Sequence, residues 1–399
     1  MKKIAAMLLA GVMVLGLAAC SKPAENAAPA EEKSAATTEA SKEAAPAEES
    51  AAPAAEGTQT VGIAMPTNSL ERWNRDGAYL KEQFEAAGYA TELTYSDNDA
   101  NKQNNDIANM IAKDVDVLII AAIDGDTLNQ TLAEALDAGI PVISYDRLIN
   151  SAAVSYYVSF DNYKVGELQG QFVIDSLDLE NATGTFNIEF TAGDPADNNA
   201  GYFFGGAYDT LTPYIESGVL NIPSGKNTFE QVATPSWDTA KAMENMQNTL
   251  ASFYSNGTVL DVALCSNDST AAGVVQAIGS DYAGKNQVIV TGQDGDIANL
   301  KNIVDGKQTM TVYKNVSDEA GVTLVLATAL LNGETPDSKL LDSFDCEAAF
   351  DTESYFTDAG PVPSYLLVPW VVTKDNLQDL VDTGLYKWDA DNKYLETVG

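Results

Sequence analysis

The chain has 399 residues, of which 58 are acidic, 22 are basic and none is histidine, so its formal net charge is −36. This charge argues against nucleic acid, anionic ligands and anionic membrane faces as partners, because like charges repel. It suits a neutral or cationic small ligand, although much of it also serves as a solvated acidic surface. The absence of histidine removes the commonest metal ligand and the commonest general base.

Residues 1–19 are predicted to be a signal peptide. Lys2 and Lys3 precede the apolar run Ile4–Ala19, which is too short for a permanent membrane span. Leu17-Ala18-Ala19-Cys20 then resembles the lipobox of bacterial lipoproteins, and this resemblance implies that lipid is attached to Cys20. The alternative is an ordinary secretory signal that happens to contain a cysteine. Because two or more acyl chains give a stable anchor, we expect an extracytoplasmic protein that is lipid-anchored to the cell membrane.

Residues 20–58 are predicted to comprise the lipidated cysteine and a disordered tether. Ser21 to Thr58 consists almost entirely of Ala, Pro, Glu, Ser, Thr and Lys, with no aromatic residue. Such a segment buries too little apolar surface to offset the entropy lost on ordering, and its prolines interrupt any helix. As a flexible coil it would let the folded part range on the order of 35 Å from the anchor.

From Gln59 onward, short apolar runs alternate with amphipathic stretches of helical period. This part of the chain is longer than a single hydrophobic core usually supports, so we expect two lobes. Alternating strands and helices indicate βαβ units with parallel sheets, in two halves that meet near Phe160–Asn162. Expected strands are Thr60–Ala64, Ala90–Tyr95, Val117–Ala121, Val142–Tyr145, Tyr156–Phe160, Phe186–Phe190, Val262–Cys265, Val288–Gly292 and Met310–Tyr313. Expected helices lie near Arg75–Ala87, Lys102–Lys113, Asp126–Ala138, Ala200–Glu216, Thr239–Tyr254, Ser269–Ile278 and Asp296–Asp305.

Several of these strands end in a polar residue that is suited to bonding a hydroxyl group. Asp146 follows one strand, Asn267 a second, Asp294 a third and Lys314 a fourth. A single strand-end aspartate is most simply a turn residue or a helix cap. Ligands of open α/β sheets bind outside the carboxyl ends of the strands, so four such ends favour a shared polar cleft.

The common catalytic and metal-binding motifs do not fit. The chain has no Gly-x-Gly-x-x-Gly, no P-loop and no Gly-x-Ser-x-Gly elbow. Asp97–Asn101 imitates the start of a calcium loop, but Lys102 and Ala108 occupy the positions that require Gly and Glu. We expect this segment to cap the following helix instead. With 58 acidic residues, the sequence does not exclude the pair of carboxylates that a glycosidase needs, although no motif marks such a pair.

Two cysteines remain after Cys20 is assigned to lipid. Cys265 ends a buried-looking strand and Cys346 lies in a loop-like stretch. An export compartment permits a disulfide between them, and the alternative is a buried free thiol at Cys265.

Seven segments together resemble one protein family. They are Met65–Trp73 (MPTNSLERW), Ile120–Gly125, Ser144–Ile149, Ser159–Asn162, Gly193–Ala200 (GDPADNNA), Gly292–Asp294 and Gln308–Lys314 (QTMTVYK). The family is the xylose and multiple-monosaccharide branch of the sugar-binding proteins that serve bacterial ABC importers, and the resemblance covers Val61–Val372 in order. It implies the type I periplasmic-binding fold, an α/β fold of two Rossmann-like lobes with parallel sheets joined by three crossovers. The expected segments are 59–162 for the N-terminal lobe, 163–313 for the C-terminal lobe, 314–366 for a return to the first and 367–399 for a return to the second.

The resemblance also implies a set of sugar-binding residues. They are Arg72, Trp73, Asp146, Arg147, Asp197, Asn199, Trp237, Asn267, Asp294 and Lys314, and Asp124 follows them in rank as a residue at the edge of the cleft. Carboxylates accept bonds from vicinal hydroxyls, cationic side chains donate charge-assisted bonds to oxygens, and tryptophan faces cover the C–H faces of a pyranose. The alternatives are a partly exposed packing role for Trp237 and a surface ion pair for Arg147.

The predicted function is that of a lipid-anchored protein that binds an aldopyranose (xylose, glucose or galactose) and delivers it to an ABC transporter permease. We expect a monomer with no cofactor, no metal, no enzymatic activity and no nucleic-acid partner. One rival is a sugar sensor whose closed form signals to a chemoreceptor or histidine kinase. The other is a sugar-active enzyme. Family members often have a short signal and a free periplasmic chain, so the lipobox and the tether are a departure.

Overall fold

The computed structural model describes residues 58–398, and its first lobe is built on a seven-stranded sheet in the order β11-β14-β5-β4-β3-β1-β2. The neighbouring strands are parallel except for the pair β11–β14. The carboxyl ends of the six parallel strands therefore share one edge of the sheet. The strands are β1 (Thr60–Met65), β2 (Ala90–Tyr95), β3 (Val117–Ile120), β4 (Val142–Tyr145), β5 (Tyr156–Phe160), β11 (Ala348–Asp351) and β14 (Ser364–Leu367).

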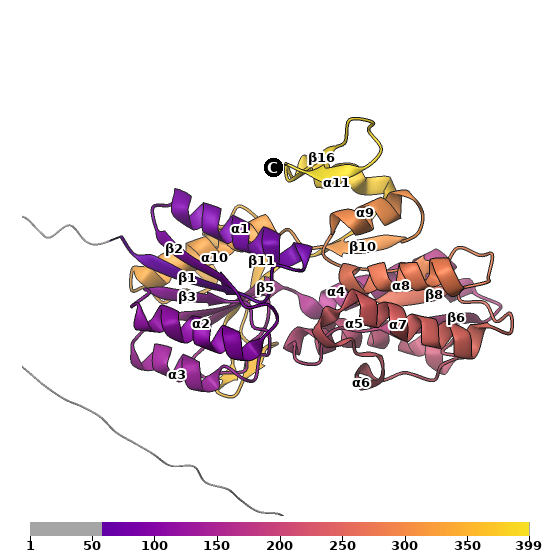
Figure 1. Ribbon diagram of the computed structural model, residues 1–399, viewed down its shortest axis with the longest axis horizontal. Coiled ribbons are helices and arrows are strands. Elements are labelled where there is room, and N and C mark those ends of the chain that lie inside the picture. The colour runs from indigo at the N-terminus through magenta and orange to yellow at the C-terminus, as the bar shows by residue number, and fades with distance from the viewer. Residues whose placement is uncertain (1–57, 399) are drawn as a thin grey trace, which may run out of the picture. The chain divides into compact units, whose positions relative to one another are not determined.

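Helices cover both faces of this sheet (Figure 1). Helices α1 (Glu71–Ala86) and α10 (Val316–Leu331) pack on one face, and α2 (Ala100–Ala112) and α3 (Asn129–Asp137) pack on the other. Successive residues of a strand point to opposite faces, so Ile63 packs with α1 and α10 while Ala64 packs with α2 and α3. Full burial of a Leu or Phe side chain contributes roughly 1.5–3 kcal/mol, and both faces contain several.

The second lobe has a four-stranded parallel sheet in the order β7-β6-β8-β9. Helices α4 and α5 share one hydrophobic core with this sheet, and α7 and α8 share another. The strands are β6 (Phe186–Thr191), β7 (Leu220–Asn221), β8 (Val262–Cys265) and β9 (Ile289–Val290). The helices are α4 (Asn162–Leu177), α5 (Asn198–Glu216), α6 (Phe229–Val232), α7 (Thr239–Thr249) and α8 (Asp268–Asp281).

Helices α4 and α5 pack backbone to backbone through two glycines. A Cβ atom on Gly166 would lie 2.1 Å from the carbonyl oxygen of Phe203, and one on Gly206 would lie 2.1 Å from that of Tyr163. No larger residue fits at either position without moving a helix.

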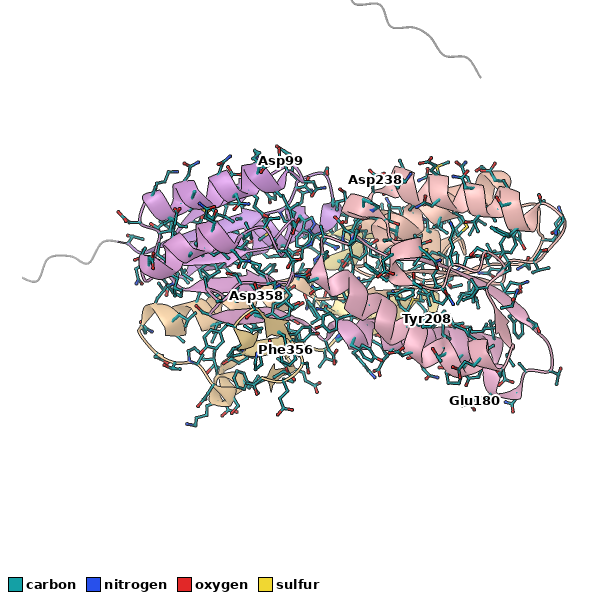
Figure 2. All side chains as sticks on the ribbon, turned by 90° about the horizontal axis from the view of Figure 1, so that it is seen from below. Asp99, Glu180, Tyr208, Asp238, Phe356 and Asp358 are labelled. Atoms are coloured by element: carbon teal, nitrogen blue, oxygen red, sulfur yellow. The ribbon has the colours of Figure 1, made fainter. Side chains whose placement is uncertain are left out.

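The chain passes between the lobes three times, after β5, after β10 (Met310–Tyr313) and after β14. Strand β10 pairs antiparallel with β15 (Trp370–Thr373), and an isolated bridge from Gln293 to Val312 joins β10 to the loop that follows β9. Helix α9 (Ile297–Val304), which precedes β10, shares a hydrophobic core with the C-terminal helix α11 (Leu377–Asp382) and the hairpin of β16 (Tyr386–Trp388) and β17 (Leu395–Thr397). A second hairpin, β12 (Phe356–Thr357) and β13 (Gly360–Pro361), follows β11 and exposes Phe356 (Figure 2).

Two expected segment boundaries differ from the structure. Asn162, which we expected in the first lobe, begins α4, because its helix packs against α5 in the second lobe. Leu367, which we expected in the return to the second lobe, is the last residue of β14, because it pairs with Phe160 of β5.

Asp99 accepts hydrogen bonds from the backbone N–H groups of Asn101 and Lys102 and so caps α2, as Asp238 caps α7 by accepting from Lys241 (Figure 2).

Cys265 and Cys346 are both free, so the disulfide alternative is wrong. The predicted signal peptide, Cys20 and the tether up to residue 57 lie outside the described residues. In residues 58–398, no helix has the length and apolar character needed to cross a membrane.

Candidate functional site

The strand-end residues converge on one cavity between the two lobes. Its lining includes all of the expected sugar-binding residues except Asn199, and it does not include Asp124. Leu70, Phe203, Ser269 and Gln293, which sequence reasoning did not assign to the site, complete the wall. The cavity has a volume of about 30 Å³, which suffices for water.

Two aspartates from opposite lobes share two cations at the centre of the site. Asp146 follows β4 of the first lobe and accepts bonds from Nη2 of Arg72 at 2.6 Å and Nζ of Lys314 at 3.2 Å. Asp294 follows β9 of the second lobe and accepts from Nη1 of Arg72 at 3.0 Å, with Nζ of Lys314 at 3.5 Å. Burial opposes the ionisation of Asp146, but Arg72 and Lys314 outweigh it and lower the pKa of this carboxyl below its ordinary value.

Arg72 is held from behind by two further carboxylates that sequence reasoning missed. Nε of Arg72 donates to Asp76 at 2.8 Å, one turn along α1, and Nη2 donates to Glu319 of α10 at 3.0 Å. Tyr145 donates a bond to Asp76 at 2.7 Å. Burial raises the pKa of both Asp76 and Glu319, and the nearby carboxylate of Asp146 adds to the shift at Glu319. The spacing of Arg72 and Asp76 was the only sequence signal for this support, since i,i+4 pairs face each other on a helix.

Three cavity residues have a left-handed backbone that non-glycine residues rarely adopt. Their φ angles are 55° at Asp146, 53° at Trp237 and 103° at Asp294. Each such residue costs on the order of 1–3 kcal/mol and persists only where the surroundings enforce it. Within the cavity, the strain therefore falls on both central carboxylates and on one aromatic wall.

Trp73 and Arg147 form one side of the cavity. The guanidinium of Arg147 lies 4.9 Å from the ring centroid of Trp73, a cation–π distance. Nη1 of Arg147 donates to the carbonyl of Ala122 at 2.9 Å, and its Nε lies 3.3 Å from Oδ2 of Asp197 in the second lobe. Only 5% of Arg147 is exposed, so the alternative of a surface ion pair is wrong.

Trp237 forms the facing aromatic wall from the second lobe. It is 4% exposed, packs edge-on against Phe203 with ring centroids 6.2 Å apart, and donates from Nε1 to Asp197 at 3.2 Å. The alternative of a partly exposed packing residue is therefore wrong. Gly193 lets the ring reach this place, because a Cβ atom there would lie 2.0 Å from Cη2 of Trp237.

Asn267 and Gln293 supply amide groups to the second-lobe side. The side chain of Asn267 accepts from the backbone N–H of Thr270 at 2.9 Å, so it caps α8 and lines the cavity at once. Gln293 donates to the carbonyl of Ser266 at 3.1 Å, while its Oε1 is buried without a partner among residues 58–398. A buried acceptor without a partner is costly and suits a hydroxyl donor.

Two expected site residues lie elsewhere. Asn199 does not line the cavity, because its amide donates to the backbone carbonyl of Asp146 from behind and its oxygen accepts from the hydroxyl of Tyr157 at 3.0 Å. It therefore positions Asp146 from the other lobe. The carboxylate of Asp124 accepts from the backbone N–H of Asp126 in a local turn. Its neighbour Gly125 contacts the second lobe, donating to the carbonyl of Ala196 at 3.2 Å.

The comparisons with known proteins match this architecture. The family model described as "Periplasmic binding protein domain" matches residues 61–335. The "Multiple sugar-binding periplasmic receptor ChvE" of Rhizobium radiobacter is 44% identical over 83% of this chain and 91% of its own length. The D-xylose-binding periplasmic protein of Escherichia coli (strain K12) is 34% identical over 80% of this chain and 88% of its own.

A solved structure with a close sequence also matches. The ABC transporter solute-binding protein of Clostridium phytofermentans, with bound β-D-glucose, has a TM-score of 0.78 and 46% identity over 84% of this chain and 99% of its own. The resemblance seen in the sequence motifs and the type I fold that it implied are therefore confirmed. The chain belongs to the periplasmic binding protein family, in the branch of the sugar-binding solute receptors of ABC transporters.

Proposed function

We propose that this protein binds a neutral aldopyranose, namely glucose, xylose or galactose, between its two lobes and delivers it to an ABC importer. The observation that carries the proposal is the cavity that carboxylates and tryptophans of both lobes line together. The similar proteins support it, since they are named for binding multiple sugars and D-xylose, and one has bound β-D-glucose.

The charges of the cavity favour a ligand without net charge. Its lining has three carboxylates and three cations, contributed by Asp146, Asp197, Asp294, Arg72, Arg147 and Lys314. A sugar hydroxyl both donates and accepts, so it bonds a carboxylate and a cation at neighbouring positions. A sugar phosphate or a sugar acid would add charge that no spare cation of the lining balances. The two tryptophans supply flat apolar faces for the C–H groups of the ring.

Binding places the sugar beside the ion pairs that join the lobes. A pyranose enters when the lobes separate and is enclosed when they close, next to Arg72, Lys314 and the carboxylates that they bind. Closure of two lobes about hinge segments is the established motion of periplasmic binding proteins. The ligand binds the closed form better and so shifts the population toward it. The sugar is released unaltered to the permease.

The proposed location is the outer side of the cell membrane, with lipid on Cys20 as the anchor and the folded part as a monomer. The motif Leu17–Cys20 supports this proposal, together with a tether of polar and small residues. Cys20→Ala should release the protein into the soluble fraction and leave the sugar affinity unchanged. Retention of this variant on membranes after a high-salt wash would contradict the lipid anchor.

A thermal-shift panel of monosaccharides tests the binding function. A ligand at a hundred times its Kd adds about 2.7 kcal/mol to the free energy of unfolding, so glucose, xylose or galactose should raise Tm clearly. Glucose 6-phosphate and glucuronate serve as charged controls and should give no shift. Titration calorimetry then gives the affinity, and chromatography of the recovered sugar should find it unchanged. No shift with any neutral aldose, or a chemically altered product, would contradict the proposal.

A further inference from the structure

Arg75 joins the two lobes at a place outside the ligand cavity. It lies one turn beyond Arg72 on α1 of the first lobe, and its side chain is 11% exposed. Its Nη2 donates to the carbonyl of Asp294 at 2.9 Å and lies 3.2 Å from Oδ1 of Asp296. Its Nη1 donates to the carbonyl of Gly295 at 3.2 Å. One guanidinium thus binds three consecutive residues of the second lobe.

The segment that Arg75 binds has an unusual backbone. Both Asp294 and Gly295 have positive φ angles, of 103° and 68°, and this turn directs their carbonyls to the first lobe. A side chain at Gly295 would also meet the ring of Tyr313 at 2.8 Å. Because Asp294 is one of the two carboxylates at the centre of the cavity, whatever fixes this turn also fixes a ligand-facing group.

Two neighbours complete the contact. Oε1 of Glu71, the first residue of α1, accepts a bond from the backbone N–H of Ile297 at 3.1 Å, where α9 begins. The hydroxyl of Tyr386 lies 2.8 Å from Nη1 of Arg75 and donates to the carbonyl of Gly295 at 3.2 Å. Tyr386 is 3% exposed in the core of the C-terminal hairpin. The first turns of α1, the turn 294–296 and the C-terminal hairpin therefore meet at Arg75.

We propose that Arg75 is a positioning residue that latches the two lobes together and, by holding the turn 294–296, keeps the carboxylate of Asp294 aimed into the cavity. This proposal rests on the proposed sugar-binding function. Planar guanidinium geometry is essential to it, because a lysine ammonium cannot span two carbonyls, a carboxylate and a hydroxyl at the same time. The latch exists only while the lobes are together, so its loss should act on ligand release more than on ligand capture.

The test measures glucose dissociation and association rates by stopped-flow tryptophan fluorescence, using Trp73 and Trp237 as reporters. Arg75→Met should raise the dissociation rate at least about tenfold, equivalent to roughly 1.4 kcal/mol, with the association rate nearly unchanged. Arg75→Lys should behave like Arg75→Met. Tyr386→Phe, which removes only a hydroxyl group, should give a smaller increase. Lys81→Met is the matched control, because Lys81 is an exposed residue of the same helix that pairs only with Glu85, and it should bind like the parent.

Small-angle scattering separates the failure of the latch from the failure of the sugar-binding proposal. The radius of gyration of the ligand-free protein should increase in Arg75→Met relative to the parent and to Lys81→Met. If the parent binds no aldose, the sugar-binding proposal fails, and the radius of gyration still decides on the latch. Parent-like dissociation and a parent-like radius in folded Arg75→Met, or full recovery in Arg75→Lys, would overturn the latch. If Arg75→Met does not fold, the other two variants decide. The latch is overturned when Tyr386→Phe and Arg75→Lys both release glucose at the parent's rate.

Discussion

Asp146 and Asp294 come from different lobes, yet both bind the same guanidinium of Arg72 and approach the same ammonium of Lys314. In the present arrangement, each cation therefore bridges a carboxylate of one lobe to a carboxylate of the other. A sugar in the cavity lies within reach of the same carboxylates, which can accept bonds from its hydroxyls while they stay paired with the cations. The ion pairs thus hold acceptors from both lobes in place for ligand hydroxyls.

We predict that Asp146→Ala and Asp294→Ala each weaken aldose binding at least about tenfold, or roughly 1.4 kcal/mol. Each removes an acceptor for ligand hydroxyls and leaves Arg72 with one carboxylate fewer. Titration calorimetry with the preferred aldose measures the effect. Asp124→Ala is the matched control, because Asp124 caps a local turn away from the cavity, and it should bind like the parent. A deoxy sugar that lacks the contacted hydroxyl should lose less affinity for the matching mutant than for the parent. If both aspartate variants bind the aldose with the parent's affinity, the assignment of this cavity as the sugar site is wrong.

Lys314→Ala should weaken sugar binding and leave a larger population of open molecules at sub-saturating sugar. Lys314 is 3% exposed and lies next to the crossover between β10 and α10, so its loss leaves two carboxylates from opposite lobes with a single shared cation. Small-angle scattering across a sugar titration measures closure. Lys307→Ala, at an exposed lysine that pairs with Asp305, should match the parent. Full closure of Lys314→Ala at both low and saturating sugar would refute the coupling.

Gly193→Ala should weaken sugar binding about tenfold or more while the protein still folds. The added methyl group would lie 2.0–2.4 Å from three carbons of the Trp237 ring, so the rigid indole must leave its present position against the cavity. Calorimetry and tryptophan fluorescence check the two effects. Gly201→Ala, where a Cβ atom meets nothing within 4 Å, is the matched glycine control. Parent-like affinity in Gly193→Ala would show that the ring position does not matter for the ligand.

Thermal stability should fall as pH rises from about 5 to about 8. Burial raises the pKa of Asp296 from 3.8 to about 7, although Arg75 opposes the shift. The folded state therefore binds a proton that the unfolded state has lost in this interval, so the stabilisation is complete below the ordinary pKa and disappears above the raised one. Burial shifts the pKa values of Asp268 and Glu319 in the same direction.

Scanning calorimetry at fixed ionic strength tests this pH dependence. Asp296→Asn should reduce the difference in Tm between pH 5 and pH 8 by at least about 3 °C. The charged groups that face Asp296 are Glu71, Arg72, Arg75, Asp268 and Asp294. Asp305→Asn, at an exposed carboxylate whose pKa is lowered, should keep the parent's dependence over this range. An unchanged slope in Asp296→Asn would assign the effect to other groups.

Much of the fold follows from local sequence pattern. Strands β2, β4, β5, β8 and β10 have the predicted bounds, because each is a short run closed by polar or turn residues. Helices α4 and α10 were missed for a physical reason. Helix α10 is apolar on most sides, since it packs on the sheet and against α1, and so it lacks the alternation that marks an amphipathic helix. Helix α4 contains Gly166 and Gly170, which are helix-disfavouring residues required by its contact with α5.

The candidate site, too, could be predicted from the sequence only in part. Asp146, Asn267, Asp294 and Lys314 could be placed because strand ends meet at one edge of a sheet, which is a property of topology. Glu319 could not be placed, since it reaches Arg72 from a helix about 250 residues away in the chain and its local sequence is that of any buried helix. Asn199 was assigned to the cavity wall but lies behind Asp146, because residue type does not fix which way an amide points.

The sheet of the first lobe is completed by β14, which pairs with β5 although about 200 residues separate Ser364 from Tyr157. Contacts between such distant residues form slowly, because closing a long loop costs conformational entropy before the contacts stabilise the fold. A fragment that ends near residue 162 would lack two of its seven strands and expose an unpaired edge at β5, an aggregation hazard. We therefore expect the first lobe to complete its sheet only after residue 367 has been synthesised, and not to be obtainable as a stable fragment of continuous sequence.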